Sequence, residues 1–381
     1  MNRRENVLDL VKAAFIVLIV KVMASSSVIM PWNSLVDNLC IAFAICVMLA
    51  KFCRLTFPLG RLAALGVLSV LALYTCVSMK QYDLLVTVVA ILLLIDEDLE
   101  EYISLMLKIQ AAILIGHIAV SGFLSLTGSA DQFWFVSDDR LRFNGGFIHS
   151  NVLSCYILSC MLMFAWKRFR RITPNQFGWM ACITVLSFIM SRSRTGLLLN
   201  LLLLLLIFLT QNENPLMERV INPVLLLLFP GLSAMFFWVQ KQYASGSRAA
   251  LILDDLLTGR IKYAAYANLR SGTTWLPRYL DYADTGRVSW TPEWNLNTFT
   301  FDCLFSFLFT QMGMIWIGVI TVLIAVVCRK LRFRNKLFIL YWVLFSVVEV
   351  HGLNCFKFFP LLLLSTLLSG KGAENHPSRK N

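Results

Sequence analysis

The chain has 381 residues, of which 58% are hydrophobic and 15% charged, and its formal net charge is +12. Soluble domains are about 45–50% apolar and about 25% charged, so this composition excludes soluble enzymes and secreted modules. The apolar residues form long uninterrupted runs, such as residues 197–209, and not the stripes of amphipathic helices. Lys and Arg lie in short clusters between these runs, as membrane orientation requires, so the charge does not indicate nucleic acid.

A window of about 20 residues predicts about twelve membrane-spanning helices and therefore an all-α fold. Arg3 and Arg4 precede the first span, which could be a signal peptide; because Lys12 and Lys21 interrupt it, we interpret it as an uncleaved helix. The expected spans cover about residues 8–28, 35–53, 62–79, 84–95, 102–126, 147–166, 177–191, 196–210, 221–240, 300–328, 337–350 and 355–369. They divide the chain into helices 1–9 (residues 1–240), a long extracytoplasmic loop (241–299), and helices 10–12 with a cytoplasmic tail (300–381).

The positive charges predict the orientation. If both termini are cytoplasmic, 18 Lys and Arg residues lie in inner loops and six in short outer loops, and cytoplasmic loops normally carry this excess. The loop at 241–299 then lies outside. It combines positive charges and aspartates with Trp275, Trp290 and Trp294, a mixture suited to sugar stacking and anion binding, and loops this long are usually functional.

Two clusters of polar residues lie at the outer ends of spans in the first half of the chain. Arg142, His149 and Asn151 are expected at the mouth of the sixth span, where Gly145 and Gly146 allow close approach of the backbone to a ligand.

The second cluster reads Ser-Arg-Ser-Arg-Thr-Gly and lies between two strongly apolar spans, with almost no loop. Placing Arg192 and Arg194 at such depth in the membrane costs free energy unless the two arginines are paired or bound to an anion. A hairpin whose arginines reach out to the surface is the structural alternative, and an anion site is the interpretation we favour.

Two further clusters lie in the second half. Arg260 is in the long loop, and Asp302 leads into the tenth span, where a carboxylate is favourable as a helix cap alone. Glu349 and His351 lie where the eleventh span ends, and ionisable residues at membrane depth are by default a functional hypothesis.

Together these arginines, histidines, carboxylates and aromatic residues suit an acidic ligand presented from the outer leaflet. Diphosphate is the natural candidate, because Arg binds phosphate oxygens with two parallel hydrogen bonds. We expect no metal and no cofactor, since the chain has four His and lacks an H-E-x-x-H motif. Asp96-Glu97-Asp98 forms a D-x-D pattern, which we interpret as a solvated acidic turn in an inner loop.

At these residues the sequence resembles the polymerases that assemble bacterial surface polysaccharides, the Wzy family, which belongs with the O-antigen ligases. The resemblance covers nearly the whole chain and depends on the order and spacing of four weak motifs. They are Gly146-Phe-Ile-His149-Ser-Asn151, similar to G-F-x-H-P-N with Ser150 in place of Pro; Ser193-Arg194-Thr195, similar to S-R-T; Thr258-Gly259-Arg260-Ile261, similar to S/T-G-R-I; and Glu349 followed by Asn354 and an apolar run.

The resemblance implies a metal-independent multi-span glycosyltransferase in the bacterial cytoplasmic (inner) membrane, with its active site facing outside. The family transfers a growing glycan from undecaprenyl diphosphate to the sugar hydroxyl of another lipid-linked repeat unit. The product is a capsule, an O-antigen or another exopolysaccharide. The implied partners are the undecaprenyl-diphosphate-linked oligosaccharide, a chain-length regulator and a flippase.

The chemistry of this transfer assigns roles to the candidate residues. Negative charge develops on the diphosphate as the glycosidic bond breaks, so we expect Arg260 and Arg194 to stabilise the transition state. The acceptor hydroxyl needs a base on the opposite face of the sugar, either Asp302 or His149, and inversion follows. Cys303 follows Asp302 where relatives often have D-N or H-N, so the base stays open. The remaining substrate-binding candidates are Arg192, Arg142, Asn151, Glu349 and His351.

Two other functions stay open. A ligase that moves finished glycan to another acceptor shares the resemblance and differs only in the acceptor. A transporter or flippase of lipid-linked glycan would place charges near the bilayer midplane and often shows internal repeats, whereas these charges lie at one edge and the sequence shows no repeat.

Overall fold

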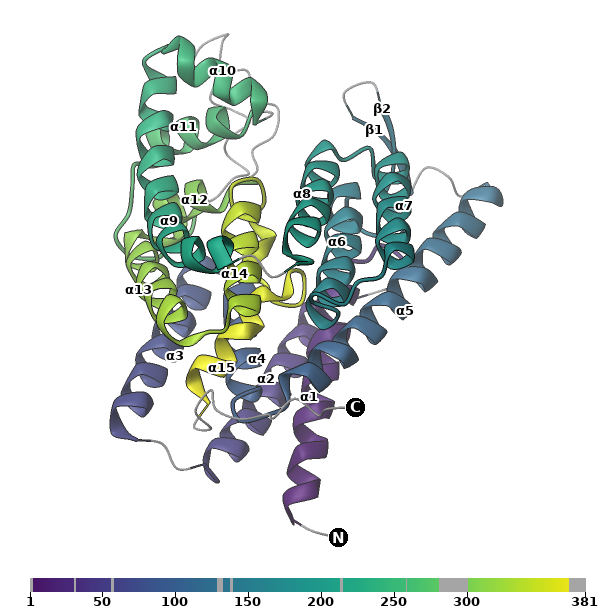
Figure 1. Cartoon of the computed structure of the whole chain (residues 1–381), viewed down its shortest axis with the longest axis vertical. Coiled ribbons are helices and arrows are strands. Elements are labelled where there is room, and N and C mark those ends of the chain that lie inside the picture. The colour runs from purple at the N-terminus through teal and green to yellow at the C-terminus, as the bar shows by residue number, and fades with distance from the viewer. Residues whose placement is uncertain are drawn as a thin grey trace. The chain divides into compact units, whose positions relative to one another are not determined.

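The computed structural model describes residues 3–30, 32–55, 58–128, 133–137, 140–212, 215–257, 259–280 and 301–369 (Figure 1). These residues are mostly helical, in agreement with the all-α prediction, and add one two-stranded hairpin. The chain forms two compact units, both discontinuous in sequence. The first contains residues 1–58, 89–215 and 354–381, and the second contains residues 59–88 and 216–353.

Four helices in the described part of the chain are long and apolar enough to cross a membrane: α2 (Ser34–Phe52), α3 (Leu59–Met79), α5 (Leu99–Leu126) and α9 (Pro215–Ala244). Shorter apolar helices are α4 (Asp83–Leu93), α8 (Arg194–Thr210) and the helical stretch Phe359–Leu368. By length and composition, these helices support a membrane protein. The total of about twelve spans stays a prediction, as does the orientation.

The first unit packs α1 on α2 and α5, and α6 on α5, α7 and α8. The antiparallel hairpin lies against α7 and pairs Phe135 with Arg142 (Figure 1). Helices α6 and α8 pack closely at Gly196, where the absence of a side chain makes room for the Ser154 hydroxyl. A Cβ at this position would collide with that hydroxyl. The further elements of this unit are α1 (Arg3–Ala24), β1 (Trp134–Ser137), β2 (Arg140–Phe143), α6 (Ser150–Lys167), α7 (Pro174–Ser191), η6 (Phe359–Leu364) and α15 (Ser365–Leu368).

Lys12 and Lys21, the two lysines inside the first expected span, both have acidic partners. Lys12 Nζ lies 2.7 Å from Glu101 Oε1 on α5, and Lys21 Nζ lies 3.2 Å from Asp37 Oδ2 on α2. A charge among apolar helices is tolerated when it is paired. The two ion pairs therefore join α1 to its neighbours α5 and α2.

The second unit contains α3, α9 and the elements from α10 to η5. Figure 1 shows α10 and α11 at the end of α9, so the first part of the expected loop at 241–299 is helical. Residues 281–300, with Trp290 and Trp294, lie outside the described residues. The later elements are α10 (Arg248–Leu256), α11 (Arg260–Ser271), α12 (Leu304–Phe307), η4 (Leu308–Met312), α13 (Met314–Lys330), α14 (Phe333–Phe345) and η5 (His351–Leu353).

The expected tenth span, 300–328, is not one continuous helix. α12 passes into the π-helix η4, which ends at Met312. Gly313, with φ +90°, interrupts the helical backbone, and α13 begins at Met314. A distant segment satisfies the backbone at this break: the Thr274 N–H donates to Phe309 O, and the Met314 N–H donates to Thr274 O, both at 2.9 Å. The prediction failed because the run stays apolar through the break, and irregular backbone among apolar helices is stable where other parts of the protein bond it.

The expected twelfth span, 355–369, is also not one helix. It begins with a turn in which Asn354 Oδ1 accepts from the Phe356 N–H at 3.0 Å, and η6 and α15 follow. Asn side chains favour such turns, and Pro360, at the start of η6, has no N–H to continue a helical ladder. Hydropathy alone could not distinguish this arrangement from a spanning helix.

Candidate functional site

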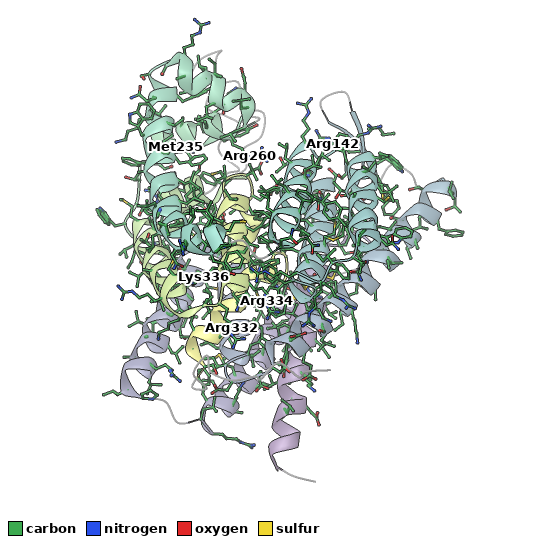
Figure 2. All side chains as sticks on the ribbon, viewed as in Figure 1. Arg142, Met235, Arg260, Arg332, Arg334 and Lys336 are labelled. Atoms are coloured by element: carbon green, nitrogen blue, oxygen red, sulfur yellow. The ribbon has the colours of Figure 1, made fainter. Side chains whose placement is uncertain are left out.

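Arg260 is the first residue of α11 and is only 6% exposed. The preceding Gly259 has φ +83°, a left-handed conformation that favours glycine. Arg260 Nη1 donates to Leu257 O, and Arg260 Nε donates to Val348 O, both at 2.9 Å. Two segments far apart in the sequence therefore fix the orientation of the guanidinium. Figure 2 shows Arg260 at the opposite end of α14 from the basic residues Arg332, Arg334 and Lys336.

Glu349 lies in the turn after α14 and is the acidic partner of Arg260. Glu349 Oε1 is 3.9 Å from Arg260 Nη2, and the two side chains are 5% and 6% exposed. This distance exceeds that of a hydrogen bond, so the contact is an attraction between charges. A buried charge without a partner of opposite sign is destabilising, so each of these residues offsets part of the cost of burying the other.

Asp302 brings a second carboxylate to this pair. It is half-buried, and its charge acts on Glu349. Helix α12 begins at Leu304 with Cys303 as its N-cap and without a side-chain cap, so Asp302 does not cap this helix and that alternative interpretation is wrong. The Leu304 N–H donates to Ser346 O at 3.0 Å, which fixes the start of α12 beside the end of α14. The second unit thus brings Arg260, Glu349 and Asp302 together, as one site requires.

Our sequence reasoning missed Asp254 on α10, which is 6% exposed. Its carboxyl accepts from the backbone N–H groups of Ile261 and Lys262 in the first turn of α11, the helix that begins with Arg260. Burial raises the pKa of Asp254, and these two hydrogen bonds oppose the rise. One feature of the sequence could have indicated this role. Gly259, before Arg260, has no side chain with which to cap a helix, so a nearby acidic residue such as Asp254 is a candidate for the cap.

In the first unit, residues 191–196 form a tight turn between α7 and α8. Arg192 adopts a left-handed conformation with φ +50°, which is uncommon outside glycine. Ser193 caps α8, since its Oγ accepts from the Gly196 N–H at 3.2 Å. Both Arg192 and Arg194 are exposed, so an anion can reach the two guanidinium groups.

A cavity of about 470 Å³ adjoins this turn and is lined by Leu141, Phe188, Arg192 and Arg194. Arg142 follows Leu141 on β2 and is half-buried; Figure 2 labels it on the hairpin. The hairpin therefore closes one side of a cavity that carries two positive charges. This arrangement suits an anionic ligand.

His149 is the N-cap of α6, and its Nδ1 accepts from the Asn151 N–H at 3.1 Å. A ring nitrogen that accepts carries no proton, so the neutral ring has its proton on Nε2. In this tautomer Nε2 already carries a proton, and Nδ1 accepts the hydrogen bond from the Asn151 N–H. His149 could therefore take a proton from a hydroxyl only after this hydrogen bond is lost. Asn151 is half-buried in the first turn of α6.

The glycines before His149 serve packing, and the expectation that they give a ligand access to the backbone is wrong. A Cβ at Gly145 would lie 3.0 Å from Leu153 Cδ1, and one at Gly146 would collide with the side chain of Ile29. Both glycines also have positive φ. Side chains of the protein therefore fill the space that a ligand would have needed.

The D-x-D turn has structural contacts. Glu97 Oε1 lies 2.6 Å from the buried Lys51 Nζ, and Asp96 Oδ1 accepts from the Ser369 hydroxyl at 2.6 Å. Asp98 caps α5 through the Glu100 N–H. The interpretation as a solvated turn is therefore wrong for Glu97, whose side chain is only 15% exposed.

The candidate residues thus fall into two groups, one in each unit. Arg260, Glu349 and Asp302 belong to the second unit, where His351 follows in η5 and is half-buried. Arg142, His149, Asn151, Arg192 and Arg194 belong to the first unit. Within the described ranges, no group of three or more His, Cys, Asp or Glu residues could hold a metal ion. No protein-family model, no curated protein and no solved structure matches the chain.

Proposed function

We propose that the protein is a polymerase of a bacterial surface polysaccharide. It transfers glycan from undecaprenyl diphosphate to a sugar hydroxyl of another lipid-linked repeat unit, as a multi-pass protein of about twelve spans in the cytoplasmic membrane. One observation carries the proposal: Arg260, Glu349 and Asp302, which come from three separate stretches of the sequence, lie together in one unit.

The arginine of this group suits a diphosphate leaving group. Negative charge grows on the diphosphate as the anomeric C–O bond breaks, so a cation that is already oriented lowers the barrier more than one that must first be ordered. The carbonyls of Leu257 and Val348 orient Arg260 in this way. The guanidinium fork also matches two phosphate oxygens.

The carboxylate of Asp302 is the base in this proposal. The acceptor hydroxyl oxygen forms a bond to the anomeric carbon, its proton passes to Asp302, and the bond to the diphosphate oxygen breaks. Undecaprenyl diphosphate leaves with the electron pair, and the anomeric centre is inverted. Asp302 is preferred over His149 because the Nδ1 of His149 is occupied as a helix cap.

The exposed arginines of the first unit are proposed as further binding residues. Arg192 and Arg194 line a common cavity and can attract the diphosphate or an acidic sugar of the substrate. Arg142, Asn151 and His351 keep their proposed role in substrate binding.

Deletion of the gene tests this function in the native host. A polymerase predicts that single lipid-linked repeat units accumulate and long glycan is lost, and restoration of long glycan by the native gene is the control. Accumulation of full-length glycan that is not attached to its acceptor would contradict the proposal and indicate a ligase. Accumulation of repeat units on the cytoplasmic side of the membrane would instead indicate a flippase.

A further inference from the structure

Helix α11 begins without a cap of its own. Its N-cap residue, Gly259, has no side chain, whereas the first N–H groups of a helix need acceptors. Asp254 on α10 supplies them: Oδ1 accepts from the Lys262 N–H at 2.8 Å, and the carboxyl also accepts from the Ile261 N–H. The backbone takes part as well, because the Gly259 N–H donates to Asp254 O at 2.9 Å.

The carboxyl of Asp254 is itself held in place. The residue is 6% exposed, and the hydroxyl of Tyr243, near the end of α9, forms a hydrogen bond with it. Negative charge beside the N-terminus of a helix is favourable, because the N–H groups there carry partial positive charge. The next residue, Asp255, is exposed and provides a matched control for substitution.

These contacts act on Arg260 because it is the first residue of α11. Arg260 Nη1 also donates to the carbonyl of Leu257, directly after α10. The end of α10 therefore fixes Arg260 twice, through Asp254 at the backbone of α11 and through Leu257 at the guanidinium. A shift of the first turn of α11 would move the guanidinium away from Val348 and Glu349.

We propose that Asp254 is a positioning residue for glycan transfer and that it acts through Arg260. This inference rests on the proposed function, in which Arg260 binds the diphosphate. A displacement of about 1 Å in such a group can cost about 10²-fold in rate. Because Arg260 is proposed to act on charge that develops in the transition state, the loss should appear in kcat more than in KM.

The test uses the full-length protein in lipid nanodiscs and, as substrate, the lipid-linked oligosaccharide extracted from a strain that lacks this gene. Turnover is compared for the native chain, Asp254→Ala, Asp254→Asn, Asp255→Ala and Arg260→Ala. Hydrogen exchange of the α11 backbone is followed by mass spectrometry in the same samples. This second measurement reports on the first turn of α11 independently of catalysis.

Asp254→Ala should speed hydrogen exchange in the first turn of α11 and lower kcat by about 10- to 100-fold, while KM changes by less than about threefold. Asp254→Asn keeps a carbonyl oxygen that can accept one N–H, so its exchange and its kcat should lie between those of the native chain and Asp254→Ala. Asp255→Ala should match the native chain in both measurements.

Native kcat in Asp254→Ala beside an inactive Arg260→Ala would overturn this inference and leave the proposed function intact. Unchanged exchange in Asp254→Ala would overturn it as well, because the carboxyl would then not hold α11. A fully active Arg260→Ala would instead contradict the proposed role of Arg260, and with it the basis of this inference.

Discussion

Nη2 of Arg260 lies 3.9 Å from Oε1 of Glu349, and both side chains are almost fully buried. The negative charge of Asp302 also acts on Glu349, so the partner of the guanidinium lies under the influence of a second carboxylate. The carbonyls of Leu257 and Val348 hold that guanidinium independently of either acid. A ligand that takes the place of Glu349 beside Arg260 must offer negatively charged oxygens, as a diphosphate does.

Arg260→Ala should abolish polymer, and Arg260→Lys should not restore it. An ammonium group lacks the planar fork that bonds two carbonyls and a phosphate in fixed geometry. Polymer is measured by gel electrophoresis of extracted glycan, and protein abundance by immunoblot of membranes. Near-normal polymer from Arg260→Ala would remove this residue from the site.

A matched double variant separates folding from function at this pair. Removal of one partner of a buried ion pair costs about 3–5 kcal/mol, so Arg260→Ala alone should lower the abundance of the protein. Arg260→Ala combined with Glu349→Gln removes both charges and should restore much of the abundance without restoring polymer. Recovery of polymer in the double variant would show that Arg260 serves only to balance Glu349.

Substitution of the two candidate bases should give different results. Asp302→Asn removes the basic oxygen at constant size and should lower activity by about 10²–10⁴-fold, the range typical for loss of a general base. His149→Gln keeps an acceptor for the Asn151 N–H and should therefore have a mild effect. Polymerisation is measured in membranes with lipid-linked repeat units. An active Asp302→Asn beside an inactive His149→Gln would transfer the role of base to His149.

The stability of Asp254→Asn relative to the native chain should increase with pH. Burial raises the pKa of Asp254 above its ordinary value of 3.8, so the folded protein holds this proton more tightly than the unfolded chain does. The corresponding stability is present below pH 3.8 and is lost as the pH rises through the raised pKa, whereas the amide of the variant has no such proton to lose. Thermal unfolding of both proteins in nanodiscs at a series of pH values measures the difference in Tm, and a difference that does not change with pH contradicts this prediction.

Reporter fusions should show the expected orientation. Fusions after residues near 170, 215 and 333 should report the cytoplasm, and fusions near 135 and 270 should report the outside, because 18 positive residues lie in the expected inner loops and six in the short outer loops. Fusions at two neighbouring positions in each loop control for local effects. A cytoplasmic signal near residue 270 would place Arg260 on the wrong side of the membrane for the proposed reaction.

The sequence was sufficient for the helical membrane class, because composition carries that information. The sequence also selected Arg260, Glu349 and Asp302, which the structure brings together in the second unit and whose roles stay predictions. It was not sufficient for the break at Gly313, whose hydrogen-bond partners around Thr274 are distant in sequence and leave no mark on hydropathy. It also did not indicate Asp254, whose role follows from the geometry of the turn at Gly259. Such features depend on which backbone groups meet after folding.

Reconstitution tests the central claim most directly. The purified protein in lipid nanodiscs is given lipid-linked single repeat units from the deletion strain, in the presence of EDTA, and the glycans are separated by size. We predict a ladder of oligomers that remain attached to undecaprenyl diphosphate, with one equivalent of free undecaprenyl diphosphate for each bond formed. Repeat units that stay unchanged, under conditions in which the same protein restores polymer to the deletion strain, would contradict the account.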